Sequence, residues 1–343
     1  MRKPAMLIVR FLSCLPFAVI AVAVFFTART LFEQNKPAGR TVFYIAGTIG
    51  LYSFGEFVVG PLYWVSHARL EVCDPVIYRI EALTGLACPA LVDNLFRLVL
   101  HWPGIFVTLL IIYDSLTLLV VLAASSEACH ADWSITDNLY VRFAVGALVG
   151  FALYYILPAV GPGPFFGKAF PGDLPASLAS PHAFTLFADG GVTDRNAMPS
   201  LHATWTILCF LALRRSPLWH RCLGALYVAV TFMITIGMGY HYLLDWVVAL
   251  PLVLLIRALT SSRPVRARLV AFGTGGGLLL LWCAIIRLAP WSLAHPDYIQ
   301  AVILASVILP VMLERRLAFG GVFGAGQSRW AAARGKPASF AAD

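Results

Sequence analysis

Two stretches of the sequence, Asn196-Ala-Met-Pro-Ser-Leu-His-Ala203 and Tyr240-His-Tyr-Leu-Leu-Asp245, place histidines where long apolar segments meet polar loops. One apolar segment runs from His202 to a cluster of arginines, and a second returns to His241. An antiparallel pair of helices would bring both histidines to the same end of the molecule. Asp245 follows His241 by four residues, so both lie on one helical face. The two stretches therefore predict a polar site at the end of a helical pair.

The composition around these stretches is that of an integral membrane protein. The chain has 343 residues, of which 60% are hydrophobic and 12% are charged, and its mean hydropathy is +0.81. These values are too apolar for a soluble domain. The apolar runs are separated by Pro, Gly and charge clusters, and they have roughly the 20 residues that a helix needs to cross a bilayer. We expect an all-α, polytopic transmembrane helical bundle.

Nine stretches are expected to span the membrane. They are residues 5–27, 42–64, 103–124, 139–159, 199–213, 222–240, 242–261, 268–288 and 298–314. The segment 66–102 mixes charges with apolar residues and is expected to lie along the membrane interface. We divide the chain into N-terminal helices with this segment (1–102), a helical core with both histidines (103–261), and two further helices with a basic tail (262–343).

The net charge of +8 is concentrated in short loops and in the C-terminal tail. It therefore indicates membrane topology rather than binding of nucleic acid. Counting spans back from these basic loops places the 161–197 loop and both histidines on the extracytoplasmic face. The same count puts the acidic loop of Glu127, Asp132 and Asp137 on the cytoplasmic side.

The seven cysteines show no metal-ligand spacing, so no zinc site is expected. Cys73 and Cys88 share one segment. A disulfide between them and two separate buried thiols are both open interpretations.

The residue types around the histidines suit phosphoryl chemistry. Pro199 fits the first turn of a helix, whose exposed amides and dipole would bind phosphate. Asp245 could accept from one imidazole nitrogen of His241 and leave the other free to attack phosphorus. Two alternatives are that the histidines serve packing, or that His202, His241 and Asp245 hold a metal ion.

Together, Pro199-Ser-Leu-His202 and His241-Tyr-Leu-Leu-Asp245 resemble the motifs of the type 2 phosphatidic acid phosphatase superfamily, also called lipid phosphate phosphatases. The resemblance covers about residues 139–261. Within the superfamily it is most similar to the branch that includes inositol phosphorylceramide synthase. The resemblance implies a six-helix core inside the bundle.

The resemblance also implies roles for individual residues. His241 would be the nucleophile that forms a phosphohistidine, with Asp245 supporting it. His202 would be the general acid that protonates the leaving oxygen, and Ser200 would contact the phosphate. No cofactor and no metal are expected in this double displacement.

Three features depart from the phosphatase pattern. Ile234 and Thr235 stand where the third motif has Ser-Arg, the first motif of Lys and Arg-Pro is missing, and Leu201 replaces a glycine. A transferring phosphoryl group still needs cationic stabilisation. Lys168 and Arg195, in the loop before His202, are the expected substitutes.

Two further residues are candidates for substrate binding. Tyr240 precedes the second histidine directly, and Asp114 lies inside the third expected span. An ionisable residue within a span is by default a functional candidate. Asp114 is therefore expected to line the substrate cavity, with a structural pairing as the alternative.

These observations favour an enzyme that transfers a phosphoryl or phospho-headgroup unit, and the resemblance implies that it acts in the manner of an inositolphosphotransferase. A monoester dianion needs more positive charge than a diester monoanion, so the missing arginine favours head-group transfer. The expected substrate is a phospholipid or isoprenoid phosphate from the bilayer, and an alcohol or polyol is a possible acceptor. The alternatives are a lipid phosphate or polyprenyl diphosphate phosphatase, and a non-catalytic transporter or scaffold. The expected location is a bacterial inner membrane.

Overall fold

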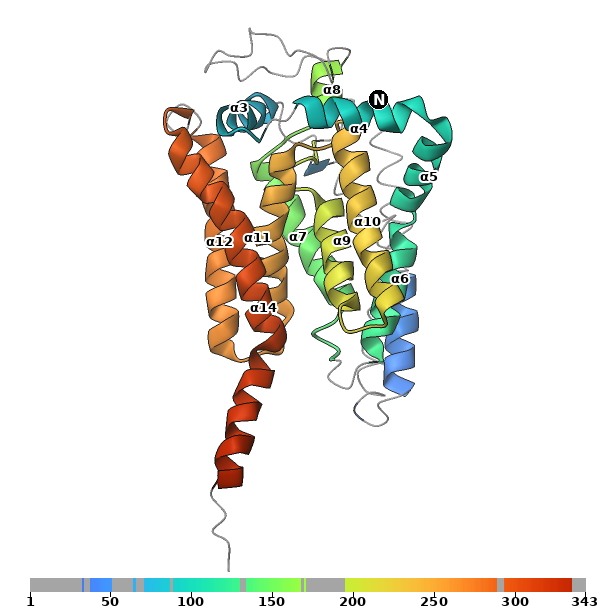
Figure 1. Ribbon diagram of the computed structural model, residues 1–343, viewed down its shortest axis with the longest axis vertical. Coiled ribbons are helices and arrows are strands. Elements are labelled where there is room, and N and C mark those ends of the chain that lie inside the picture. The colour runs from blue at the N-terminus through green and yellow to red at the C-terminus, as the bar shows by residue number, and fades with distance from the viewer. Residues whose placement is uncertain are drawn as a thin grey trace, which may run out of the picture.

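The computed structural model describes residues 33, 38–50, 64–65, 71–86, 89–129, 134–167, 170, 195–288 and 293–334 (Figure 1). Every regular element within these ranges is a helix, as the sequence predicts. Most of the helices run side by side along the long axis of the molecule (Figure 1). This part of the chain is therefore an all-α bundle.

Five helices in the described part of the chain are long and apolar enough to cross a membrane. They are α7 (Leu139–Ile156), α10 (Leu218–Gly237), α11 (Leu243–Thr260), α12 (Val265–Arg287) and the Pro296–Ala318 part of α14 (Pro296–Arg334). Their number is that of an integral, multi-pass membrane protein. The expected count of nine is not confirmed, and the first expected span, 5–27, lies outside the described residues.

The expected span 103–124 is divided into two helices, α5 (Pro103–Asp114) and α6 (Leu116–Ala128). Ser115 separates them, and its hydroxyl lies 2.6 Å from the hydroxyl of Tyr227 on α10. The expected span 199–213 is also shorter than predicted, because its helix, α9, begins at Leu201 and ends at Leu213. Hydrophobic runs alone do not reveal such breaks.

Three helices lie at the upper end of the bundle (Figure 1). These are α3 (Asp74–Thr84), α4 (Pro89–His101) and the five-residue α8 (Pro162–Phe166). Helices α3 and α4 run across the long helices, and the end of α4 meets α5 at 101°. The expected interfacial segment 66–102 is thus helical and transverse where the structure describes it. Cys73, just before α3, is buried, whereas Cys88 is outside the described residues, so their pairing stays a prediction.

Helix α11 occupies the centre of the core, with 72% of its spanning window buried. It contacts α7, α9, α12, α14 and α3. Gly275 of α12 allows one of these contacts, because a Cβ atom there would come within 2.9 Å of the Pro251 carbonyl oxygen. The glycine run of α12 therefore serves helix packing at Gly275.

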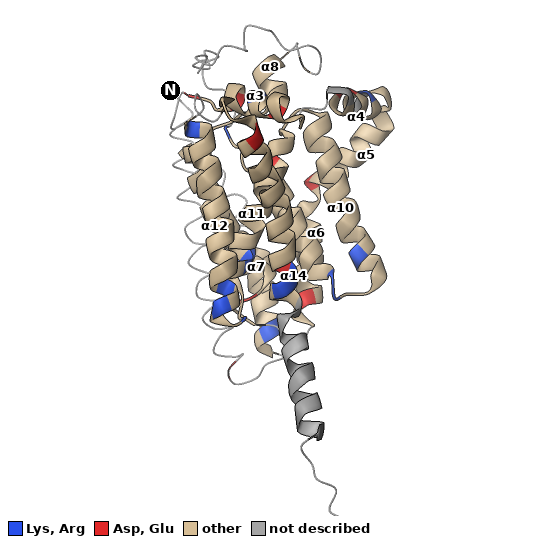
Figure 2. Cartoon of the chain, turned by 60° about the vertical axis from the view of Figure 1, so that its left-hand side comes forward, with Lys and Arg blue, Asp and Glu red and all other residues tan. Residues whose placement is uncertain are grey.

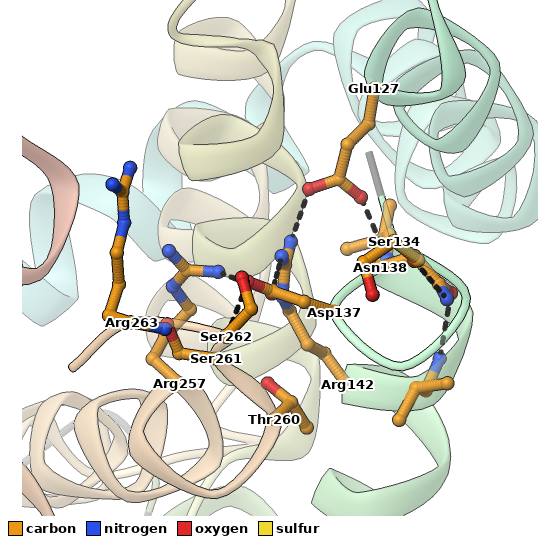
Figure 3. A network of polar contacts seen from close by, with 12 residues as sticks. Glu127, Ser134, Asp137, Asn138, Arg142, Arg257, Thr260, Ser261, Ser262 and Arg263 are labelled. Atoms are coloured by element: carbon orange, nitrogen blue, oxygen red, sulfur yellow. Dashed lines mark hydrogen bonds and ion pairs between the residues drawn. The ribbon is translucent and has the colours of Figure 1, made fainter. Parts of the chain in front are cut away.

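At the lower end of the bundle, buried charges form a network (Figures 2 and 3). Arg142 of α7 is 4% exposed; its Nη1 atom lies 2.6 Å from Glu127 Oε1, and its Nη2 atom donates to Asp137. Glu127 also accepts from the amide of Leu139 at 2.8 Å. These carboxylates neutralise an arginine, which explains why an acidic loop lies at the same end as the basic loops.

The network continues into the C-terminal helices. Arg257 of α11 lies 3.5 Å from Asp137 and 3.3 Å from Glu314 of α14, and Arg214 lies 2.9 Å from Glu314. Arg257 is 7% exposed, because these ion pairs bury it between helices.

Candidate active site

Three loops meet at the upper end of the bundle and build the candidate site. They are residues 158–163 after α7, 195–200 before α9 and 238–242 between α10 and α11. The amide of Ala197 donates to Ala159 O at 2.9 Å, and the amide of Gly163 donates to Gly239 O at 2.7 Å. Backbone hydrogen bonds thus join the first loop to both of the others.

Gly161 makes this close approach possible. Its φ of 89° lies in the left-handed region that favours glycine. A Cβ atom at this position would come within 2.2 Å of the carbonyl oxygen of Tyr240. Any larger residue here would push the 158–163 loop away from the turn that carries His241.

His241 is buried, and both of its ring nitrogens have partners. Its Nδ1 atom lies 2.8 Å from Ala197 O and 3.2 Å from Asp245 Oδ2. A carbonyl oxygen can only accept, so Nδ1 carries the proton and Nε2 keeps its lone pair. Burial lowers the pKa of His241 to about 4, although the bond to Ala197 opposes this shift. The imidazole is therefore neutral near pH 7, with a nucleophilic Nε2.

Ser200 faces this lone pair. Its Oγ atom lies 3.1 Å from His241 Nε2 and accepts from the Ala203 amide at 3.2 Å. Ser200 is consequently the N-cap of α9, and the helix begins one residue later. The expectation that Pro199 forms the first helical turn is wrong, because the side chain of Ser200 takes the capping position. The positive end of α9 still points at His241.

Asp245 is fully buried and has two contacts in this turn. Its Oδ2 atom faces His241 Nδ1 and also accepts from the Tyr242 amide at 2.8 Å. Its Oδ1 atom has no hydrogen-bond partner among the described residues. The carboxylate thus caps α11 and supports the histidine at the same time.

His202 lies in the first turn of α9, close enough to His241 for an electrostatic interaction. Its ring stacks on Tyr113 of α5, with centroids 4.6 Å apart and an angle of 24°. The ring of Trp205 lies at 67° to that of His202, with the two centroids 6.0 Å apart. The sequence pattern does not indicate this stack, and it favours the neighbouring Asp114 as the residue that lines the site. Aromatic residues in an apolar run give no signal of such a contact.

The other predicted binding residues are placed differently. Arg195 is 2% exposed in the loop before α9, whereas Tyr240 is 41% exposed beside His241. Asp114 has an exposed side chain at the end of α5, and Lys168 lies outside the described residues. Their roles in binding phosphate stay predictions.

Thr235 occupies the position where the third motif of the phosphatases has an arginine. Its side chain is fully buried, donates to Thr231 O at 2.7 Å and accepts from Trp246 Nε1 at 3.0 Å. Its backbone oxygen accepts from the amide of His241 at 3.0 Å. This position supports the histidine turn and supplies no charge. Among the described residues, no three His, Cys, Asp or Glu side chains are grouped so as to hold a metal ion.

A protein-family model matches the part of the chain that carries the candidate site. The family model of the PAP2 superfamily matches residues 75–259, which is more than half of the chain. The chain belongs to the PAP2 superfamily. The matched region contains the loops of the site and both histidines. No curated protein and no solved structure gives a significant match. Membership in the PAP2 superfamily supports an activity of the lipid phosphatase or phosphotransferase type.

Proposed function

We propose that this PAP2 superfamily protein transfers a phosphoryl or phospho-headgroup unit from a lipid to an alcohol through a phosphohistidine on His241. The observation that carries the proposal is the orientation of the His241 ring. Nδ1 is held by Ala197 O and Asp245, and Nε2 points toward the N-terminus of α9. A neutral, oriented imidazole at a helix N-terminus is suited to attack on a bound phosphate.

In the first step, His241 Nε2 attacks phosphorus and the bond from phosphorus to the lipid oxygen breaks. The negative charge of the bound phosphate favours protonation of His202, which donates its proton to that leaving oxygen. The Ser200 hydroxyl turns from Nε2 to donate to a phosphoryl oxygen. The phosphorylated imidazole carries positive charge, which Asp245 stabilises together with the Ala197 carbonyl.

In the second step, His202 is neutral and accepts the proton of an incoming hydroxyl group. The oxygen of that group attacks phosphorus, and the bond from phosphorus to Nε2 breaks. The products are a new phosphate ester and His241 in its original state. An alcohol as acceptor gives a transferase, and water gives a phosphatase.

The low positive charge of the site supports a diester donor. Thr235 supplies no cation, and Arg195 is the cationic residue in the described loops of the site. A phosphodiester carries one negative charge, so it needs less compensation than a monoester. The proposed location is the bacterial inner membrane. We place the site on the extracytoplasmic face, because the basic loops lie at the other end of the bundle (Figure 2).

The test is incubation of the purified protein with phosphorus-labelled phospholipids and isoprenoid phosphates, with and without alcohols or polyols. We expect label to move to an alcohol, and His241→Ala to abolish this. His220→Ala is the matched control, since His220 lies near the other end of α10. Release of inorganic phosphate alone would show a phosphatase instead. No product from any donor would contradict the catalytic proposal and favour a transporter or scaffold.

A further inference from the structure

Helix α3 contains two buried carboxylates that the transfer steps do not use. Asp74 is fully buried and Glu81 is 6% exposed. They are seven residues apart, so both lie on the same face of the helix. This helix lies across the upper end of the bundle, beside the loops of the site (Figure 1). Buried carboxylates are costly, so their contacts call for an explanation.

Asp74 binds two of the segments that form the site. Its Oδ2 atom accepts from the Val160 amide at 3.0 Å, and its Oδ1 atom accepts from the Gly161 amide at 2.9 Å. Oδ1 also lies 3.2 Å from the hydroxyl of Tyr242, the residue after His241. Both oxygens are engaged, and one side chain joins α3 to the 158–163 loop and to the start of α11.

A short path of hydrogen bonds leads from this loop to the nucleophile. Ala159, next to Val160, accepts from the Ala197 amide at 2.9 Å. The carbonyl of Ala197 in turn accepts from His241 Nδ1 at 2.8 Å. The position of the Ala197 carbonyl, and with it the orientation of His241, therefore depends on where the 158–163 loop is held.

Glu81 acts on the other side of the same turn. Its Oε1 atom accepts from the Leu244 amide at 2.7 Å, directly before Asp245. This amide belongs to the first turn of α11, whose N–H groups have no partner within the helix. Glu81 thereby holds the helix end that carries Asp245.

We propose that Asp74, assisted by Glu81, is a positioning residue that sets the orientation of His241 through the 158–163 loop and the first turn of α11. The inference rests on the proposed function of His241. Asp74 does not touch the substrate in this account. Its effect is on the geometry of attack, and a misplacement of about 1 Å can lower a rate about 100-fold.

The test compares Asp74→Asn with Asp93→Asn. Asn offers one oxygen in place of two, so its amide group would oppose the Val160 or Gly161 amide. We expect kcat to fall about 100-fold while KM changes less than about threefold, because positioning acts on the chemical step. Asp93 lies on α4 with its side chain 37% exposed, paired to Arg97, and its variant should behave as the unmodified protein. Unchanged kcat in Asp74→Asn, or a loss confined to KM, would overturn the proposal.

A milder variant covers the case in which Asp74→Asn does not fold. Tyr242→Phe removes only the hydroxyl that contacts Asp74, and one hydrogen bond of this kind is worth about a two- to tenfold loss of kcat. Retention of full kcat in folded Tyr242→Phe would then count against the positioning role.

Hydrogen–deuterium exchange separates this inference from the proposed function, because it needs no substrate. In folded Asp74→Asn, or in Tyr242→Phe if Asp74→Asn does not fold, the amides of the 158–163 loop and of Ala197 should exchange faster than in Asp93→Asn. If the unmodified protein turns over no lipid, the proposed function fails, yet faster exchange would still support the path from Asp74 to Ala197. Unchanged exchange would remove that path even if the enzyme is active.

Discussion

The imidazole Nδ1 atom of His241 lies 2.8 Å from the carbonyl oxygen of Ala197, closer than its 3.2 Å distance to Asp245. Two acceptors therefore share one N–H group. The carbonyl holds the tautomer without any charge, and the carboxylate adds electrostatic support for the phosphorylated ring. This division of roles leads to a specific expectation for Asp245.

Asp245→Asn should lower kcat by about 100-fold rather than by the roughly 10⁴-fold seen when a histidine in a serine-hydrolase triad adopts the wrong tautomer. The Ala197 carbonyl remains to hold the proton on Nδ1. The measurement is the rate of phosphoenzyme formation in a single turnover. A loss as large as that of His241→Ala would show that the carbonyl does not hold the tautomer.

The loss of rate in His202→Ala should depend on the leaving group of the substrate. A general acid matters when the leaving oxygen is a poor one, such as a lipid alkoxide, and matters little for a nitrophenolate. We expect His202→Ala to lose about 100-fold or more with a lipid donor, but to release nitrophenol from an activated phosphate ester in a single burst. His241→Ala should show no burst with either donor. Equal losses of His202→Ala on both donors would contradict the acid role.

Gly161→Ala should abolish turnover. A Cβ atom here would lie 2.2 Å from the Tyr240 carbonyl oxygen, and the φ of 89° is unfavourable for alanine. Gly277→Ala on α12 is the control, because a Cβ atom there would meet no atom within 4 Å. Turnover and thermal unfolding in detergent should be measured for both variants. Full activity of Gly161→Ala would mean that the contact between the two loops is dispensable.

Stability should fall as the pH rises. Burial raises the pKa of Asp74 from 3.8 to about 7 and that of Glu81 from 4.5 to about 8, against the opposing effect of the amides that each carboxylate accepts from. The nearby charge of Asp245 adds to both shifts.

Folding thus favours the neutral forms of Asp74 and Glu81. Their contribution to the free energy of unfolding is complete below about pH 4, and it decreases as the pH rises from about 4 to about 7 to 8. The melting temperature should decrease over this range. Glu81→Gln should flatten the decrease, whereas Glu71→Gln, at a side chain 56% exposed, should not. A melting temperature that rises over this range would contradict the assignment.

Arg142→Ala should destabilise the protein by about 3–5 kcal/mol, because it leaves the partly buried carboxylate of Glu127 without its arginine and leaves Asp137 with only the longer contact to Arg257. Arg97→Ala is the control, since it removes an ion pair in which the arginine side chain is 75% exposed. Denaturant unfolding in mixed micelles measures both. Equal stability of the two variants would show that the network is not a structural support.

The sequence was least informative where helices break or where polar backbone groups act. The run 103–124 reads as one apolar span, yet it breaks at Ser115, whose hydroxyl pairs with Tyr227 on another helix. A backbone carbonyl group is present at every residue of every protein, so no side-chain pattern could indicate that the carbonyl of Ala197 faces His241. Asp74 and Glu81 were read as charges of an interfacial segment, although their spacing of seven residues could have indicated a shared buried face.

The sequence by itself determined the all-helical membrane class, the superfamily, and the pairing of the two histidine motifs at one end of the bundle. It could do so because hydrophobic length and motif spacing are local properties of the chain. The tertiary structure alone decided which nitrogen of His241 is free, which ring stacks on His202, and that α3 holds the 158–163 loop. These depend on contacts between residues far apart in the chain, such as Asp74 with Gly161 and Tyr242, which packing brings together.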